Sequence, residues 1–404
     1  MFPNLLKDKK ILLGVSASIS IYKSLELIRL FIKSGAQVRV VMSESAKKFI
    51  TPLTFETISM NKVLHSQTES WDNDLNHIKI GEWADLFIIA PASANTIAKL
   101  SNAIADNLLL QTALAYPREK LLCPAANTHM INNPLISISM QNLELCNYTI
   151  MKTQTKLLAC NTEGDGALVD IEEIYFEAAR ILLKDPFWSE REAIVTAGGS
   201  IEKIDDVRYL SNFSSGKMGA SLALALFFKG AKVHLIASRF ALRVPQSVKR
   251  TEVQSSQQMY ETLTQTLEAS RNKEKKAFLY MAAAVSDYIP ETPHRGKLKK
   301  SEIGDTFTLN MKQNRDLLAS LNKDKLYAIG FKAEMDAEQG LSNAKNMLEK
   351  KGLDAVCYNL LHDDKSFGTD DNAIEFITPN KQTSLCTKDK LSLSLELVEL
   401  CKSL

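Results

Sequence analysis

The chain has 404 residues, more than one hydrophobic core usually accommodates, so two domains of roughly 200 residues each are expected. Hydrophobic residues make up 45% and charged residues 24% of the sequence, which excludes collagen-like, coiled-coil and disordered proteins. The 49 Lys and Arg residues against 47 Asp and Glu residues leave a net charge of +2. A general polyanion binder is therefore excluded, and no nucleic-acid partner is expected.

The cysteines and the apolar runs indicate the compartment. The six cysteines are scattered, without a C-x-x-C pair or metal-ligand spacing, so zinc, iron–sulfur and disulfide frameworks are not expected. The uncharged run at residues 86–98 is too short to cross a bilayer and contains a proline, so no membrane partner is expected. The lysine-rich start resembles a secretory signal only superficially, because Asp8 interrupts it and no cleavage site follows. We expect a reduced, cytoplasmic chain.

The first 180 residues alternate short apolar runs with segments of helical period. Strands are predicted at residues 11–15, 38–42, 86–90 and 121–123, and apolar residues recur at helical spacing over residues 19–33. This alternation is typical of parallel βαβ units with helices on both faces of a sheet. Ligands of such sheets bind at the carboxyl ends of the strands, so the residues that follow each strand are candidate binding residues.

A joint between domains is predicted near Pro186. A helical segment over residues 172–183 ends there, the dipeptide Asp185-Pro186 breaks it, and the strand pattern begins again. The strands expected beyond the joint are residues 193–196, 233–237, 277–282, 327–329, 355–358 and 374–377, with a helix at residues 217–229. The sequence thus predicts an α/β protein with two doubly wound, Rossmann-like domains, residues 1–189 and 190–404.

Polar side chains follow three predicted strands of the first half. Residues 14–20 form a strand-to-helix loop of small residues, in which Ser16 and backbone amides could approach a phosphate. A tight turn with a serine N-cap explains this loop equally well. Ser43 follows the second strand, and Ser93 and Asn95 follow the third. Three polar loop ends at one sheet edge favour a ligand over simple capping.

Three further residues of the first half are weak signals one at a time. His77 is a lone histidine, and such residues are more often surface or core residues than bases. Asn127 follows a strand, where Asn is usually a turn former. Cys160 would usually be an inert small hydrophobe, but Gly164 and Gly166 follow it and suggest a flap.

Together these features resemble the homo-oligomeric flavin-containing cysteine decarboxylases, specifically phosphopantothenoylcysteine decarboxylase. The matching stretches are residues 14–23, 41–43, 77–78, 83–86, 90–95 and 105–109. The Pro-x-Met-Asn-x-x-Met motif of that family appears at residues 124–130, with Ala126 where Met is usual and Ile131 where an aromatic residue is usual. The Arg-Met pair that normally ends the substrate clamp is Ala167-Leu168 here.

The resemblance implies FMN as cofactor and a decarboxylation. Oxidation of the substrate thiol to a thioaldehyde with FMN creates the electron sink that loss of the carboxylate requires. His77 is implied as the base in this oxidation, Asn127 as the residue that holds the carboxylate, and Cys160 as the protonated donor that returns a proton. The polar loop ends become the expected FMN contacts, which are Ser16, Ser43, Ser93 and Asn95.

The second half also places small and charged residues after its strands. Gly198-Gly199 suits close approach of the backbone to a phosphate, although a simple turn is about as consistent. Asp287 lies at a strand end, and Arg295, Lys297, Lys299 and Lys300 follow in a glycine-containing loop. A run of charges is usually a solvated face. In a chain that is nearly neutral overall, this one favours a triphosphate.

This half resembles phosphopantothenate–cysteine ligase. The matching stretches are residues 196–200, 206–219, 282–288, 297–300, 330–334 and 367–372, of which Asn-x-Ser-Ser-Gly-Lys-Met-Gly at 212–219 is highly specific. The resemblance implies activation of the substrate carboxylate by CTP as an acyl-cytidylate, which Asn212 stabilises for attack by cysteine. Of the two lysines usual before a Lys-Gly pair, Lys351 matches the second, and Met347 replaces the first. The implied CTP contacts are Ala283, Asp287, Lys297, Phe331 and Lys351, with Asp287 also holding Mg²⁺.

The two resemblances cover essentially the whole chain, in the order of the bacterial bifunctional proteins of coenzyme A biosynthesis. They imply ligation of cysteine to 4′-phosphopantothenate with CTP, then decarboxylation to 4′-phosphopantetheine. They also imply trimers of the flavin domain and dimers of the ligase domain, and hence a dodecamer. Two alternatives stay open. One is a catalytically impaired flavin-binding regulatory module fused to an active ligase. The other is a tandem nicotinamide dehydrogenase, although neither half shows G-x-G-x-x-G with an acid about 20 residues later.

Overall fold

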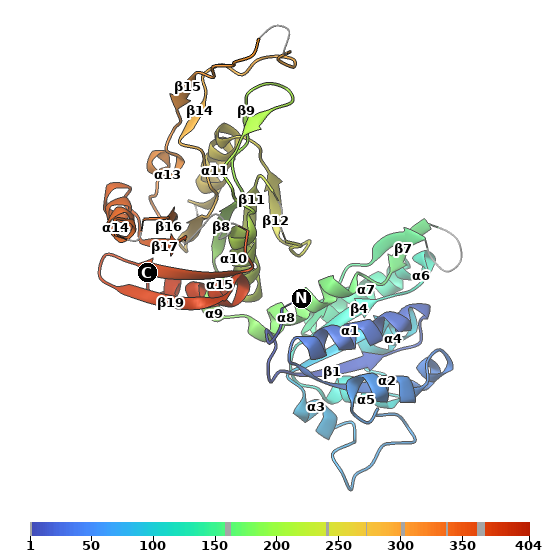
Figure 1. Cartoon of the computed structure of the whole chain (residues 1–404). Coiled ribbons are helices and arrows are strands. Elements are labelled where there is room, and N and C mark those ends of the chain that lie inside the picture. The colour runs from blue at the N-terminus through green and yellow to red at the C-terminus, as the bar shows by residue number, and fades with distance from the viewer. Residues whose placement is uncertain are drawn as a thin grey trace. The chain divides into compact units, whose positions relative to one another are not determined.

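The computed structural model describes residues 2–157, 163–239, 242–271, 273–299, 304–336, 338–361 and 368–404. The chain divides into two compact units, residues 1–183 and residues 184–404 (Figure 1). Two residues of interest from the sequence, Cys160 and Lys300, lie outside the described residues.

The first unit is built on a parallel sheet with the strand order β2-β1-β3-β4-β5. Its strands are β1 (Lys10–Val15), β2 (Gln37–Met42), β3 (Leu86–Ala92), β4 (Lys120–Pro124) and β5 (Tyr148–Ile150). Every residue of β3 is buried, as expected for a strand of a parallel sheet that is covered on both faces. The four strands predicted in this half are confirmed; β5 was not predicted.

Helices cover both faces of this sheet. One face packs on α3, α4, α5 and α7 through a cluster that includes Phe87, Ile97 and Leu143. On α1 and α8, Phe31 and Tyr175 place their rings 5.8 Å apart, and both helices contact the sheet. The remaining elements of the unit are η1 (Ile19–Ile21), α1 (Tyr22–Lys33), η2 (Glu44–Lys48), α2 (Pro52–Ser59), α3 (Lys79–Trp83), α4 (Ala94–Ser101), α5 (Leu108–Ala115), α6 (Thr128–Ile131), α7 (Pro134–Leu145), the antiparallel pair β6 (Gln154–Leu157) and β7 (Glu163–Ala167), and α8 (Ile171–Leu183).

The second unit contains a larger sheet with the order β12-β11-β8-β13-β16-β17-β18-β19. The strands from β12 to β17 are parallel, and β18 and β19 add an antiparallel edge. Their bounds are β8 (Glu192–Ala197), β11 (Lys232–Ala237), β12 (Lys249–Glu252), β13 (Ala277–Met281), β16 (Leu326–Glu334), β17 (Ala355–Leu360), β18 (Asp371–Ile377) and β19 (Gln382–Asp389). The predicted α/β class, with parallel sheets in both halves, is confirmed.

Helices also pack on both faces of the second sheet. The core between the sheet and α11, α13 and α14 includes Leu263, Leu318 and Leu348, and α10 packs against α15. The helices are α9 (Pro186–Ser189), α10 (Lys217–Phe228), α11 (Ser256–Ser270), α13 (Leu317–Ser320), α14 (Gly340–Lys350), α15 (Lys390–Leu400) and η4 (Cys401–Ser403), and the small antiparallel pairs are β9 (Glu202–Lys203) with β10 (Tyr209–Leu210) and β14 (Tyr288–Pro290) with β15 (Met311–Gln313). None of the helices in the described part of the chain has the length and apolar character of a membrane span.

Candidate active sites

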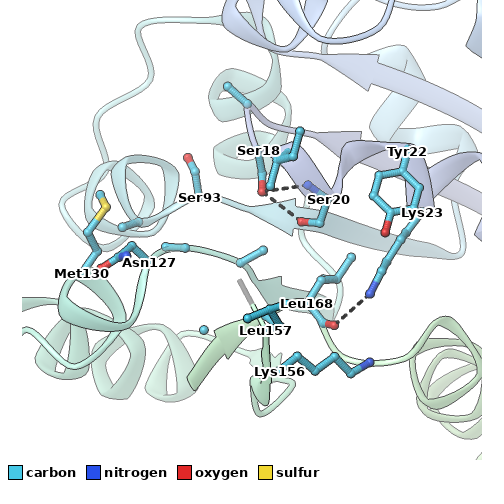
Figure 2. A pocket seen from close by; sticks show the side chains of 17 residues that line it. Ser18, Ser20, Tyr22, Lys23, Ser93, Asn127, Met130, Lys156, Leu157 and Leu168 are labelled. Atoms are coloured by element: carbon cyan, nitrogen blue, oxygen red, sulfur yellow. Dashed lines mark hydrogen bonds between the residues drawn. The ribbon is translucent and has the colours of Figure 1, made fainter. Parts of the chain in front are cut away.

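A cavity of about 630 Å³ opens at the carboxyl edge of the first sheet (Figure 2). Its lining residues come from the loop after β1, the start of α1, the start of α4, the loop after β4, and the strands β6 and β7. The cavity therefore lies where a parallel sheet is expected to bind its ligand. Its volume is within the range of small-molecule and cofactor sites.

The four serine and asparagine residues expected to contact FMN occupy different places. Ser93 lines the cavity and caps α4 by accepting a hydrogen bond from the backbone of Thr96. Ser16 is buried; its hydroxyl donates to the carbonyl of Pro91 at 2.8 Å and accepts from the backbone N–H of Ser93 at 2.9 Å. Ser43, at the end of β2, and the exposed Asn95 are not among the described lining residues. Ser16 thus links the ends of β1 and β3.

Asn127 lines the cavity from the loop that follows β4. Its side-chain Oδ1 accepts a hydrogen bond of 2.9 Å from the backbone N–H of His129, which caps α6 and fixes the side chain. Gly166 of β7 lies against the same loop, because the backbone N–H of Ala126 donates to its carbonyl at 3.0 Å. A Cβ atom at Gly166 would lie 2.2 Å from the carbonyl oxygen of Ala126, and one at Gly164 would lie 2.2 Å from Thr128 Oγ1. The two glycines therefore permit close packing of β7 on the cavity loop.

The charges that line the cavity are positive. Lys23 and Lys156 are its charged lining residues, and no carboxylate occurs among the described residues that line it. Lys23 Nζ donates to the carbonyl of Leu168 at 3.4 Å, as Figure 2 shows, and Lys156 pairs with Asp170 at 2.6 Å. Burial lowers the pKa of Lys23, and the charge of Lys156 lowers it further. This electrostatic setting favours an anionic ligand.

The other two expected decarboxylase residues are not seen at the cavity. His77 Nδ1 lies 2.8 Å from Glu69 Oε1, and its ring meets Trp71 edge-on at 5.5 Å. His77, Glu69 and Trp71 are not among the described residues that line the cavity. Cys160, which joins the cavity strands β6 and β7 in sequence, lies outside the described residues.

In the second unit, the loops after the strands pack tightly on one another. Gly198 has φ +84°, and a Cβ atom there would lie 2.3 Å from Ser238 Oγ. A Cβ atom at Gly199 would lie 2.8 Å from the carbonyl oxygen of Asn212. Asn212, Ser214 and other residues of this segment line a cavity of about 430 Å³. Asn212 therefore lies at a cavity, next to the glycine loop that follows β8.

The remaining expected ligase residues do not line this cavity. Lys297 and Asp287 have exposed side chains, and Phe331 is half-buried on β16. Ala283 donates its backbone N–H to Thr196 Oγ1 at 3.1 Å. Among the described residues, no three or more His, Cys, Asp or Glu side chains are grouped so that they could hold a metal ion. The Asp287 metal site remains a prediction.

Met347 lies on α14, and Lys351 follows the last residue of that helix. Lys351 Nζ pairs with Asp316 Oδ2 at 2.7 Å. Met347 packs on the core of the unit, where a Cβ atom at Gly330 would lie 2.7 Å from its Cε. The residue that stands where a lysine is usual therefore fills space beside a glycine of β16.

Comparison with known proteins identifies the family. The flavoprotein family matches residues 3–181, and the DNA/pantothenate metabolism flavoprotein C-terminal domain matches residues 188–404. The coenzyme A biosynthesis bifunctional protein CoaBC of Vibrio vulnificus (strain YJ016) is 33% identical over 99% of this chain and 98% of its own length. The chain belongs to the CoaBC family.

A second relative agrees over the same extent. The CoaBC protein of Bacillus subtilis (strain 168) is 34% identical over 98% of this chain and 97% of its own length. Among solved structures, the FMN binding protein AtHal3 is 30% identical, covers 43% of this chain and 95% of its own, and has a TM-score of 0.38. As a CoaBC protein, the chain is a bifunctional enzyme of coenzyme A biosynthesis.

Sequence reasoning about this CoaBC chain missed two cavity residues. Lys156 lies on the short strand β6, whose residues alternate between half-buried and exposed and belong to no recognisable motif. Lys23 stands in a matched stretch, but nothing in its spacing indicated a charged cavity lining. A search for basic residues that shortly precede the glycine pair at 164 and 166 would have found Lys156, together with Lys152, but not Lys23.

Proposed function

We propose that the chain makes 4′-phosphopantetheine in two steps. Residues 190–404 join cysteine to 4′-phosphopantothenate with CTP and Mg²⁺, and residues 1–189 decarboxylate the product with FMN. The observation that supports this proposal is common to both units. In each, the asparagine expected to hold the substrate, Asn127 or Asn212, lines a cavity beside the loops that follow the strands.

The first cavity suits a flavin phosphate and an acidic substrate. Its volume of about 630 Å³, its two lysines and the lack of carboxylates among its described lining fit anionic ligands of this size. FMN, when bound, supplies the oxidising power that turns the substrate thiol into a thioaldehyde. The bond from His129 N–H fixes the Asn127 amide with Oδ1 as an acceptor, so Nδ2 is the group of the right polarity to hold the substrate carboxylate. Cys160 then supplies the proton.

His77 gives a reason for an oligomer. Within one chain it is not a described lining residue of the cavity. We propose that the flavin domains form trimers in which His77 of a neighbouring copy reaches the cavity. With ligase dimers, these trimers would build a dodecamer, which a mass measurement in solution would detect.

In the second unit, Lys297 neutralises the triphosphate of CTP during transfer, while Asp287 carries the metal and Asn212 stabilises the acyl-cytidylate. Ala283, Phe331 and Lys351 complete the nucleotide site, as the ligase resemblance implies. Removing one preorganised charge partner from such a site costs roughly 3–4 kcal/mol, or about 10²–10³ in rate. This is the effect expected for loss of Lys297.

The proposal is tested by supplying the purified chain with 4′-phosphopantothenate, cysteine, Mg²⁺ and either CTP or ATP, and identifying products by mass. We expect 4′-phosphopantetheine, CMP, pyrophosphate and carbon dioxide with CTP. A chain that stays colourless after incubation with FMN and releases neither pyrophosphate nor carbon dioxide would contradict it.

Two variants separate the steps. Cys160→Ser should accumulate 4′-phosphopantothenoylcysteine, and Lys297→Gln should fail in ligation yet decarboxylate that compound when it is supplied. Lys300→Gln, three residues further along the sequence, is the matched control and should change ligation little. Equal effects of the two lysine substitutions would remove Lys297 from its assigned role.

A further inference from the structure

The loop that carries Lys297 is fastened to a segment about 90 residues earlier in the chain. The backbone N–H of His294 donates to the carbonyl of Ile204 at 2.9 Å. The N–H of Gly296 donates to Asp206 Oδ2 at 2.7 Å, and the N–H of Asp206 donates back to the carbonyl of Gly296 at 3.3 Å. The loop is therefore held on the side that precedes Lys297.

Asp205 holds the other side of Lys297. Its Oδ2 accepts a hydrogen bond of 3.1 Å from the backbone N–H of Leu298, the residue that follows the lysine. The carbonyl of Leu298 in turn accepts from Arg208 Nη2 at 2.9 Å. Both backbone groups of Leu298 are thus bonded, one to each member of an Asp–Arg pair.

The carboxylate of Asp205 is itself tightly held. Its side chain has no exposed surface. Oδ1 accepts from the backbone N–H groups of Val207 at 2.8 Å and Arg208 at 2.6 Å, and Oδ2 accepts from Arg208 Nε at 2.9 Å and from Arg208 Nη2. The hydrogen bonds from the Arg208 side chain hold the pKa of Asp205 well below its usual range, so the carboxylate stays ionised. Charge-assisted bonds of this kind are the stronger protein hydrogen bonds.

The segment that bears Asp205 also leads to the other ligation residue. Residues 209–210 form β10, which pairs with β9, and Asn212 follows at the cavity. The turn at residues 205–208 is thus tied to the Lys297 loop on one side and continues into the Asn212 segment on the other. A shift of this turn would displace both expected reactive groups at once.

We propose that Asp205 is a positioning residue for ligation, which sets the place of Lys297 through the backbone of Leu298 and, with Arg208, couples the lysine loop to the Asn212 segment. This inference rests on the role assigned to Lys297 in the proposed function. Asp205 touches no reacting atom. Its contribution is to fix geometry, and a displacement of about 1 Å in such a site can cost about 100-fold in rate.

We call the Asp205–Arg208 pair, with its bonds to the backbone of Leu298, the Asp205 clamp. Amide hydrogen exchange of the full chain tests this clamp without reference to activity. Asp205→Asn puts an amide where the carboxylate accepts its bonds, so exchange in the peptide that covers residues 294–299 should become at least several-fold faster. Asp354→Asn is the matched control, because Asp354 Oδ2 accepts from the backbone N–H of Ala328 at 2.7 Å in another loop of the same unit. Unchanged exchange at residues 294–299 in a folded Asp205→Asn variant would overturn the proposal.

Kinetics then test whether the clamp acts through Lys297. Asp205→Asn should lower kcat for ligation by about 100-fold, with a KM for cysteine close to that of the unaltered chain. The double variant with Lys297→Gln should be no slower than Lys297→Gln alone, because the positioned group is already missing. Multiplying effects would overturn the proposal. A silent Lys297→Gln would overturn the role of Lys297 in the proposed function as well, and the exchange result would still report on the clamp.

Arg208→Lys provides a second variant if Asp205→Asn does not fold. The Arg208 side chain is 45% exposed, so its replacement is compatible with folding, and lysine lacks the fork that reaches both Asp205 and Leu298. Faster exchange at residues 294–299 is expected here too, by a smaller factor. Exchange equal to that of the unaltered chain would count against the clamp.

Discussion

Replacement of Gly166 by alanine should disable decarboxylation and leave ligation intact. Gly166 has φ +130°, a conformation that residues with a side chain rarely adopt. Its β strand, β7, lies on the loop that carries Asn127, with the N–H of Ala126 bonded to the Gly166 carbonyl. The substitution therefore introduces a methyl group between the strand and the loop that holds the expected substrate contact.

The size of the effect follows from the packing. The added Cβ would lie 2.2 Å from the Ala126 carbonyl oxygen, whereas real Cβ atoms essentially never come within 3.0 Å of a heavy atom outside their own residue and its chain neighbours. The strand and the loop must therefore separate by about 1 Å, and a displacement of that size in an active site can cost about 100-fold in rate. Backbone strain adds roughly 1–3 kcal/mol against the native arrangement.

The assay uses both activities of one preparation. Carbon dioxide release from supplied 4′-phosphopantothenoylcysteine should fall by about 100-fold, while pyrophosphate release in ligation should stay unchanged. Gly81→Ala is the control in the same unit, because its Cβ would meet only a ring carbon of Tyr116 at 3.7 Å, an ordinary contact. A Gly166→Ala variant that decarboxylates like the unaltered chain would refute the reasoning.

Two further predictions concern the second unit. Burial of its ring lowers the pKa of His234 to about 4, so below pH 6.5 the unfolded chain binds a proton that the folded chain does not. This group should lower the free energy of unfolding by up to about 3 kcal/mol between pH 6.5 and pH 4. In urea unfolding, the His234→Gln variant should lose less stability over this pH range than the unaltered chain. An equal loss would contradict the assignment. Lys351→Gln breaks a partly exposed pair with Asp316, so stability should change by at most about 1 kcal/mol. If Lys351 contacts CTP, the KM of the Lys351→Gln variant for CTP should rise about 10-fold or more. An unchanged KM would show that Lys351 is not part of the CTP site.

The buried strands could be predicted because a strand covered on both faces is a continuous apolar run in the sequence. Strands such as β3 and β13 are apolar throughout, since both faces of a parallel sheet are covered. The pairs β6 with β7 and β14 with β15 show no such run. They are short, partly exposed and outside the main sheets, so their residues show neither helical nor alternating periodicity.

The candidate sites were predictable as motifs, but not in the contacts of single residues. The sequence cannot show that Met347 fills the space beside Gly330, because that contact depends on how α14 packs on β16. Asp205 gave no signal either, since its partner Leu298 lies 93 residues away. Contacts of this kind arise only when segments that are distant in the sequence pack together.

Several hydroxyl groups in the loops after the strands already bond to neighbouring strand ends. Ser16 bonds to Pro91 and Ser93 after the neighbouring strand of the first unit. In the second unit, Ser200 Oγ likewise accepts from the backbone N–H of Ser286 at 3.1 Å, and Ser238 Oγ donates to the carbonyl of Gly199 at 2.6 Å. These hydroxyls bind adjacent strand ends to each other.

We therefore expect ligand contacts from residues further along each loop, beyond the hydroxyl group that links the strand ends. In the first unit, Ser18 and Ser20 line the cavity with their hydroxyls 2.9 Å apart, whereas the buried Ser16 does not line it (Figure 2). Since Ser16 already uses its hydroxyl both as donor and as acceptor, contact with a phosphate would require it to give up a link between β1 and β3. Among the described residues, the hydroxyl groups of Ser18 and Ser20 bond to each other and to the backbone of the same loop. Turning these hydroxyl groups toward a phosphate therefore breaks no hydrogen bond between strands and costs less free energy.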